Sequence, residues 1–336
     1  MRRWLGIIFL LIPLLWLGWS APRFDPRHYD NRMRVDDVTA RIGAPERRAL
    51  GPFAPVAMWR LKGADRRFGG YSALVLRRDG MALRAISDRN RTLQIDLPVR
   101  TGWQEAAIPR LIVRSAGRGY YLGYDPESAV RDTEGAVWLG LEDAFHVVRA
   151  DMRTGQARFF PVPELRDWPR NGGAEAMARL NDGRWIMLCE SCGGGKGGLH
   201  LGLIFSGNPG QTKAQKFGLI MPPGFDPVDA ATLPDGRVLI LARRLVLFPL
   251  HFEAQIVLAD FAALDPKRPL PTQEVARLDG SPIRENWEGM ALMPGANPRD
   301  LALWLISDAN DSAFQETLLL QLRFDPQSLP QSGGPR

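Results

Sequence analysis

Acidic side chains recur at two matching places along this sequence, and they are the residues whose types and spacing could do chemistry. The first set, in which Ser72 takes the place of an acid in the first copy, is Ser72, Glu127, Glu175, Asp229 and Glu288. Successive members are 55, 48, 54 and 59 residues apart. The second set follows the second apolar run of each copy and comprises Asp88, Glu142, Glu190 and Asp308; the fourth copy has Arg243 and Arg244 there instead. Gathered carboxylates can bind a hard cation such as Ca²⁺, and mutual repulsion raises the pKa of some of them.

The elements that must position these acids read as repeated β-hairpins. In each copy a short apolar run, a turn and a second apolar run separate the two acidic positions. Four of the turns are tight and end in Asp-Gly or Glu-Gly, at Gly80, Gly135, Gly183 and Gly236, and the fifth is longer. Asp-Gly between apolar runs is a strong hairpin signal. Further strand candidates lie between the copies, at 145–149, 157–162, 199–205 and 254–258.

A unit of about 50 residues that holds four strands is typical of one blade of a β-propeller. We therefore expect an all-β fold, a β-propeller of four-stranded blades, preceded by an N-terminal hydrophobic helix. Five copies are visible, and a sixth blade follows if residues 34–62 hold more than one strand. Strand 55–61 should pair with strand 317–324, because that pairing closes the ring and removes an exposed sheet edge.

In a blade, the start of the first strand and the end of the second reach the same end of the central channel, so the acids should gather there. We expect a Ca²⁺ site made by Asp88, Glu127, Glu175, Glu288 and Asp308. Glu175 is the candidate catalytic base, and Arg84, Arg89 and Arg243 are candidate contacts for an anionic small-molecule ligand. Asn90 and Asn310 carry amide oxygens that also suit Ca²⁺. The alternative is that most of these acids are structural and cap turns or pair with arginines.

The N-terminal residues have the features of a targeting segment. Arg2 and Arg3 precede an apolar run at 4–19, whose length lies between that of a secretory signal and that of a membrane span. Either reading, a cleaved signal or a membrane anchor, places the rest of the chain outside the cytoplasm, in the periplasm. We expect four parts: signal or anchor at 1–21, linker and lead-in at 22–49, propeller at 50–326, and a disordered tail at 327–336.

The remaining signals are weaker. Cys189 and Cys192 are the two cysteines of the chain, and in an exported protein their spacing favours a short-loop disulfide. The 4 histidines are scattered, so we expect none to be a catalytic base. A net charge of +6 spread over mixed acids and bases argues against nucleic-acid binding. The sequence predicts no oligomeric state.

The order of motifs resembles the phytase-like family, also described as "esterase-like activity of phytase". The resemblance covers roughly 50–326 and rests on runs that begin at Phe68, Ile86, Asp125, Asn171, Asn286 and Ile306. Among them are Asn286-Trp-Glu-Gly and the near-repeat of Ile86-Ser-Asp-Arg-Asn as Ile306-Ser-Asp-Ala-Asn. The resemblance implies a propeller-like fold and an exported protein.

Two functions are compatible with these observations. The first is a metal-dependent hydrolase of phosphoesters or other esters, in which carboxylates hold Ca²⁺ and arginines neutralise the substrate. The second is a non-catalytic binding or scaffold propeller with a structural cation.

Overall fold

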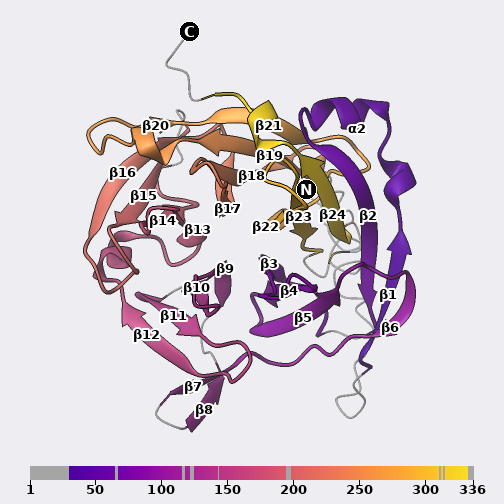
Figure 1. Ribbon diagram of the computed structural model, residues 1–336, viewed down its shortest axis with the longest axis horizontal. Coiled ribbons are helices and arrows are strands. Elements are labelled where there is room, and N and C mark those ends of the chain that lie inside the picture. The colour runs from indigo at the N-terminus through magenta and orange to yellow at the C-terminus, as the bar shows by residue number, and fades with distance from the viewer. Residues whose placement is uncertain are drawn as a thin grey trace, which may run out of the picture.

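The computed structural model describes residues 30–64, 67–115, 118–121, 125–142, 144–193, 198–309, 312 and 315–331. Five β-sheets stand around a central channel like the blades of a propeller (Figure 1). The five innermost strands contact one another in turn around the ring. The predicted all-β propeller is confirmed, and five blades is the correct count.

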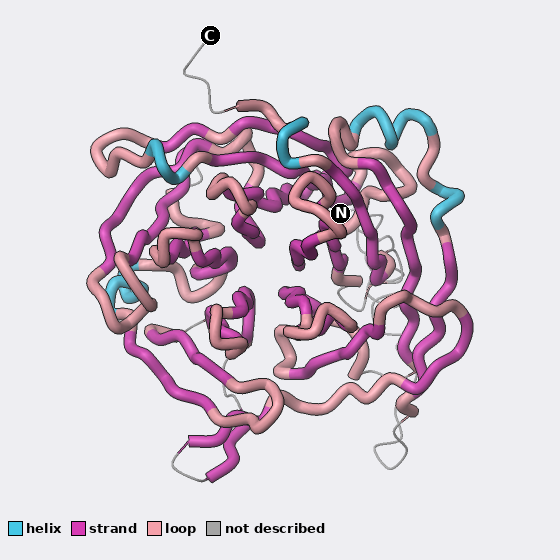
Figure 2. The backbone as a smooth tube through the Cα atoms, viewed as in Figure 1, coloured by secondary structure: helices cyan, strands magenta, loops and turns pink. Residues whose placement is uncertain are grey.

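Each blade is an antiparallel sheet that starts at the channel and ends at the rim, as the tube in Figure 2 shows. Blade I is β3 (Tyr71–Leu76), β4 (Ala82–Ser87) and β5 (Arg91–Asp96). Blade II is β9 (Pro126–Arg131), β10 (Val137–Leu141), β11 (His146–Ala150) and β12 (Ala157–Pro161). Blade III is β13 (Ala174–Arg179), β14 (Trp185–Cys189), β15 (Leu199–Phe205) and β16 (Ala214–Ile220).

Blade IV is β17 (Asp226–Thr232), β18 (Val238–Leu247), β19 (Leu250–Ala259) and β21 (Gln273–Leu278). Before β21, the short strand β20 (Leu270–Pro271) pairs in parallel with the edge of blade III. Blade V is β22 (Trp287–Pro294), β23 (Leu301–Ser307), β24 (Thr317–Phe324) and β2 (Ala54–Gly63). The expected strands between the acidic positions are thus present, as β11, β12, β15 and β19.

The ring closes within blade V, where the first part of the chain pairs with the last. Strand β2 runs antiparallel to β24, with Leu61 opposite Thr317 and Ala54 opposite Arg323 (Figure 1). This is the pairing expected from the sequence. Residues 34–62 do hold a second strand, β1 (Arg32–Asp37), but it extends blade V outward and builds no sixth blade.

The remaining short strands, helix and 3₁₀ turns lie outside the inner strands of the blades. Strand β6 (Gly102–Glu105) pairs with β1, and β7 (Ile112–Ser115) pairs with β8 (Arg118–Tyr121) as a separate hairpin. The helix α2 (Ala44–Ala49) and the 3₁₀ turns η1 (Thr39–Arg41), η2 (Pro163–Asp167), η3 (Phe261–Ala263) and η4 (Pro326–Ser328) complete the described elements. The expected lead-in at 22–49 therefore carries β1, η1 and α2.

The core lies in five seams, one between each pair of neighbouring blades. Side chains alternate along a strand, so one strand supplies two seams. In β10, Val137 and Leu139 enter the seam with blade I, while Trp138 enters the seam with blade III. Because both faces of each inner strand are buried, these strands are apolar almost throughout, and the polar residues at their ends stand out.

The expected signal or anchor at 4–19 and most of the expected tail lie outside the described residues. Within the part of the chain that is described, no helix is both long and apolar enough to cross a membrane.

Candidate functional site

A β-bulge at one shared place in the five inner strands presents the first set of side chains. In each blade the pairing of the first and second strands skips one residue of the first strand. The skipped residues are Ser72, Glu127, Glu175, Val228 and Glu288. A bulge re-aims the side chain of its extra residue, and here it does so on the strands that line the channel.

This register corrects one prediction from the sequence. Asp229 lies one residue after the bulge, and Val228 occupies the place equivalent to the three glutamates. Asp229 is buried, and its carboxylate accepts the backbone N–H of Ala230 at 2.8 Å and of Met290 at 2.6 Å. It therefore ties blade IV to blade V and belongs to the scaffold.

The second set occupies equivalent positions, as expected. Each acid follows the second strand of its blade directly, whereas Arg243 lies within β18 at the equivalent register position. The set is Asp88, Glu142, Glu190, Arg243 and Asp308. The four acids donate their backbone N–H across the hairpin to Gly70, Asp125, Gly173 and Asn286. Blade IV departs from both sets, with Val228 and Arg243 in place of acids, and blade I departs from the first set, with Ser72.

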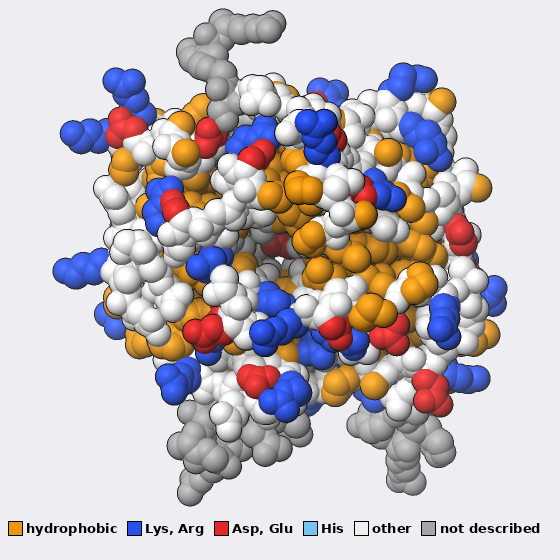
Figure 3. Space-filling view, viewed as in Figure 1, with side chains coloured by type: hydrophobic (Ala, Val, Ile, Leu, Met, Phe, Trp, Pro, Cys, Tyr) orange, Lys and Arg blue, Asp and Glu red, His pale blue; other side chains and the backbone are white. Residues whose placement is uncertain are grey.

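The acids of the two sets interact across the channel. Burial raises the pKa of Glu127 well above its ordinary value, and repulsion from Glu175, Glu288, Glu142 and Asp88 adds to the effect. Burial, with repulsion from Glu190, likewise raises the pKa of Glu175. Within the described residues neither carboxyl has a hydrogen bond or an ion pair. In Figure 3 the centre of the ring is hollowed, and acidic atoms are visible inside it.

Arg243 inserts one positive charge into this acidic group. Its guanidinium donates to Glu190 of blade III at 2.8 Å, to Asn286 of blade V at 2.7 Å, and to Glu288. Burial alone would lower the pKa of Arg243, but Glu288 and Glu190 raise it above its ordinary range, so this arginine stays charged. The predicted position of Arg243 beside the acids is correct, although in this structure it binds the acids themselves.

Opposing influences balance the protonation of Glu288, which belongs to the bulge positions. Burial raises its pKa, Arg243 and a 2.6 Å hydrogen bond from Asn286 lower it, and the resulting pKa is about 7. A carboxyl with a pKa near the working pH can both accept and donate a proton. Burial and repulsion from Glu190 raise the pKa of Glu175, our candidate base, so in the absence of a cation they favour its protonated form.

Two glycines fit closely against the second set. Gly70, with φ +68°, donates its N–H to Asp308 of blade V at 2.7 Å, and a Cβ on it would lie 2.1 Å from the Asp88 carboxylate. Gly172, with φ +73°, donates its N–H to Glu142 of blade II at 3.3 Å. Asp308 and Glu142 therefore link neighbouring blades as well as lining the site. Burial, with repulsion from Asp308, raises the pKa of Asp88, while Arg89, 3.7 Å away, lowers it.

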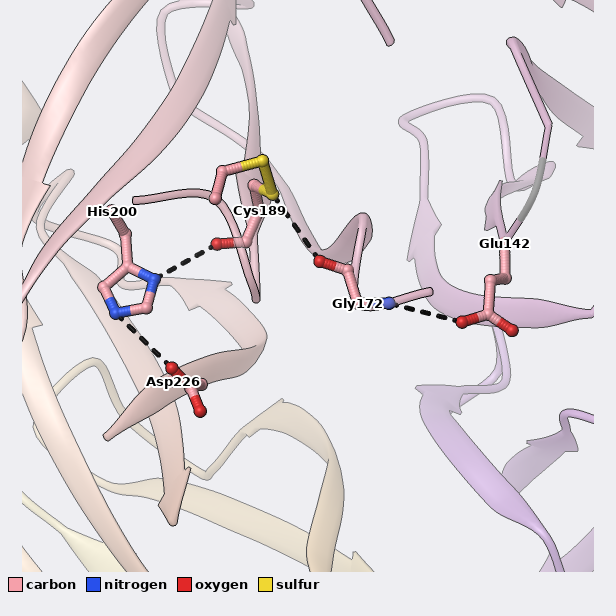
Figure 4. The surroundings of a disulfide bond; sticks show 6 residues. Glu142, Gly172, Cys189, His200 and Asp226 are labelled. Atoms are coloured by element: carbon pink, nitrogen blue, oxygen red, sulfur yellow. Dashed lines mark hydrogen bonds and ion pairs between the residues drawn. A yellow bond between two sulfur atoms is a disulfide. The ribbon is translucent and has the colours of Figure 1, made fainter. Parts of the chain in front are cut away.

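Cys189 and Cys192 form a disulfide that brackets Glu190, with their Cα atoms 5.4 Å apart. Figure 4 shows its surroundings. The Cys189 sulfur lies 3.5 Å from the Gly172 carbonyl oxygen, a contact without a proton because a disulfide carries no S–H. The buried His200 places Nδ1 3.3 Å from the Cys189 carbonyl and Nε2 3.6 Å from Asp226. The disulfide and His200 thus hold the loop that carries Glu190.

Arg84 does not reach the acids, contrary to our expectation. It is the third residue of β4, which runs from the Asp-Gly turn to Ser87, so it lies nearer the turn than the acids do and faces the space between blades I and II. Its Nη1 donates to the Met152 carbonyl oxygen at 3.3 Å. Asn90, with φ +57°, has a buried side-chain oxygen without a hydrogen-bond partner, and Asn310 lies outside the described residues.

The sequence reasoning missed Asn286, Gly70, Gly172, His200 and Asp226. Asn286 and Gly172 lie in motifs that we noted, Asn286-Trp-Glu-Gly and Asn171-Gly-Gly, but we gave them no role. A glycine next to a recurring acid is a signal for close backbone approach. His200 and Asp226 carried no signal, because they meet only when blades III and IV pack together.

The donor chemistry of the site fits a hard cation. Glu127 and Glu175 present carboxyl oxygens that no described residue uses, and Ca²⁺ prefers such ligands. As the side chains stand, however, no three Asp, Glu, His or Cys residues in the described ranges are placed together as ligands of one ion.

The sequence matches the family model for "Phytase-like: Esterase-like activity of phytase" over residues 66–311, well over half of the chain. Among curated proteins nothing matches.

The fold is similar to several solved structures. A virginiamycin B lyase from Staphylococcus aureus is 11% identical, with a TM-score of 0.43 over 79% of this chain and 98% of the other. A luciferin-regenerating enzyme is 10% identical, with a TM-score of 0.43 over 80% and 95%. The β-propeller domain of Cps50 (Swd1) from Myceliophteria thermophila is 11% identical, with a TM-score of 0.37 over 88% and 97%. At these values the likenesses carry no information about activity.

Proposed function

This chain belongs to the phytase-like family, and from that premise we propose that it is a metal-dependent hydrolase of esters, phosphoesters included. The site is the acidic end of the channel, formed by Glu127, Glu175 and Glu288 at the bulges and by the second set. The observation that carries the proposal is the excess of carboxyl groups over basic side chains there: Glu127, Glu175 and Glu288 interact with further acids, and Arg243 reaches between two of them.

Such a group has two ways to exist at neutral pH. Either several carboxyls keep their protons, or a cation enters and lets them ionise. We propose Ca²⁺, held by Glu127 and Glu175 with Asp88 and Asp308, which leaves Glu288 for proton transfer. When bound, the ion would polarise the carbonyl or phosphoryl oxygen of the substrate.

The chain's own residues supply proton transfer and orientation. Glu288, with its pKa of about 7, is suited to take a proton from an attacking water and return it to the leaving group. Glu175 remains the second candidate for this role. Arg243 fixes the Glu288 carboxylate, and Arg89, beside Asp88, is a candidate contact for an anionic substrate.

We also propose that the protein works outside the cytoplasm, in the periplasm, attached to or released from the membrane according to the fate of residues 4–19. The Cys189–Cys192 disulfide supports this, since disulfides persist in oxidising compartments. A scaffold propeller with a structural cation is the alternative that the experiment must separate.

The experiment measures hydrolysis of p-nitrophenyl phosphate and p-nitrophenyl acetate by metal-stripped protein, with and without added Ca²⁺. We expect turnover that depends on Ca²⁺ and falls by about 100-fold or more in Glu288→Gln, the loss typical of a general acid–base group. Glu105→Gln, at an exposed glutamate on β6, is the matched control. Calcium-dependent stabilisation without turnover of either ester would favour the scaffold.

A further inference from the structure

A second cavity, of about 250 Å³, lies between blades I and II, away from the acids. Its wall comes from β4, β5, the segment before β7, and the turn between β11 and β12. The lining residues that carry charge or hydroxyl groups are Arg84, Arg110, Arg153, Asp151, Thr92 and Thr154. Three arginines and one carboxylate therefore face a space large enough for a small molecule.

Arg84 is the half-buried member of this group. It forms no salt bridge with any residue that the structure describes, and its hydrogen bond goes to the neutral carbonyl oxygen of Met152. Burial lowers the pKa of Arg84, and repulsion from Arg77 lowers it further. A half-buried guanidinium normally has a carboxylate partner, so Arg84 has unused donors and an uncompensated charge.

The neighbouring charges do not supply that partner. Arg131 donates to the carbonyl oxygens of Leu76 and Gly135, and repulsion from Arg84 helps to lower its pKa after burial.

The acids nearby are engaged elsewhere. Asp79 binds Arg77, Asp132 binds Arg149, and Asp151 accepts the backbone N–H groups of Arg153 and Thr154. Figure 3 shows Lys and Arg side chains gathered over this part of the ring, between β4–β5 and β10–β11.

We propose that this cavity is an anion-binding site for a phosphate group, separate from the channel and independent of the function proposed above. A guanidinium presents paired N–H donors that match two phosphate oxygens, and the hydroxyl of Thr92 can donate to another. The volume lies below that of most drug-sized pockets, which favours inorganic phosphate or a small phosphomonoester.

Isothermal titration with inorganic phosphate and with glycerol 3-phosphate at low ionic strength tests the site. We expect binding that Arg84→Gln and Arg153→Gln each weaken about tenfold or more, the loss typical of one charge-assisted hydrogen bond. Arg268→Gln, at an exposed arginine outside the cavity, should bind as the wild type does. Glu175→Gln should also bind normally, which separates this site from the channel.

Two results would overturn the proposal: no binding of either phosphate or of phosphatidic acid vesicles, or unchanged binding in both cavity variants. Vesicles of phosphatidylcholine with and without phosphatidic acid distinguish a lipid headgroup from a soluble ligand. If Arg84→Gln does not fold, the exposed Arg153 carries the test, because its substitution leaves the blade interiors intact.

Discussion

At the scale of single residues, the site is governed by unequal protonation of similar side chains. Burial and neighbouring acids raise the pKa of Glu127 and of Glu175, whereas Arg243 and Asn286 oppose the effect of burial on Glu288 and leave its pKa at about 7. The surroundings of each glutamate thus set its pKa: Glu127 and Glu175 are shifted toward the protonated form, and Glu288 can exchange a proton near neutral pH. This division is the arrangement that acid–base chemistry requires.

The raised pKa of Glu127 predicts a pH-dependent gain from Glu127→Gln. Above the unfolded pKa of 4.5 the unfolded chain releases the Glu127 proton while the folded chain keeps it, so stability falls as pH rises. Glutamine mimics the protonated acid and removes this penalty, which amounts to about 3 kcal/mol at most at pH 7.

Urea unfolding of metal-free protein at pH 4.5 and pH 7 measures this effect. Glu127→Gln should be more stable than the wild type at pH 7 and equal to it at pH 4.5, and Glu105→Gln should match the wild type at both. A loss of stability at pH 7 would show that Glu127 is ionised in the folded protein.

At the scale of elements, β-bulges orient the acids of the site, and two glycines allow the backbone to approach them closely. In blades II, III and V the bulge at the start of the inner strand turns a glutamate toward the channel without breaking the blade, whereas the bulge residue of blade IV, Val228, packs in the seam with blade V. Gly70 and Gly172 let the backbone of one blade meet the acid of the preceding blade. Acids such as Asp308 therefore both line the channel and hold neighbouring blades together.

Gly70→Ala and Gly80→Ala form a matched pair that isolates this contact. Both glycines have φ near +70°, but a Cβ at position 80 meets nothing within 4 Å, whereas one at position 70 meets Asp88. Gly80→Ala should cost about 1 kcal/mol, the backbone penalty alone. Gly70→Ala should cost clearly more, because Asp88 must move or the Gly70–Asp308 hydrogen bond must break.

Thermal or urea unfolding of the two variants gives the comparison. Equal losses would mean that the Asp88 carboxylate moves aside freely and that the close approach contributes nothing.

At the scale of the whole molecule, stability depends on closing the ring. Strand β24 lies between β23 and β2, and its buried leucines fill both seams of blade V: Leu318 and Leu320 face blade IV, and Leu319 faces blade I. Strand β1, in contrast, adds to the outer side of the same blade. Removal of β24 should therefore destabilise the protein far more than removal of β1.

A chain that ends at Ser307 should lose cooperative unfolding, because blade V is cut and its seams are exposed. A chain that starts at Val38 lacks β1 and should keep a cooperative transition at a lower midpoint. Circular dichroism melts of both chains compare them. Similar behaviour of the two chains would contradict the assigned role of ring closure.

Much of this architecture is readable from the sequence, because Asp-Gly turns fix the hairpins and the repeat length fixes the blade content. The five blades, the β2–β24 pairing and the second set follow from that pattern. The bulge does not, since one extra residue shifts the register and made Asp229 look equivalent to Glu175. The sequence could also have shown that Arg84 lies away from the acids, because four residues of strand separate it from Asp88 by roughly 13 Å.

The central claim, that the acids of the channel bind a cation, is tested most directly by thermal melts of metal-stripped protein with increasing Ca²⁺. Because a ligand that binds the folded state alone stabilises it by mass action, Ca²⁺ at about 100 times its Kd should add about 2.7 kcal/mol and raise the midpoint by several degrees. The rise should vanish in the double variant Glu127→Gln, Glu175→Gln. No rise in the wild type, or an equal rise in the variant, would contradict a cation site at the channel and leave the acids as protonated, Arg243-paired parts of the scaffold.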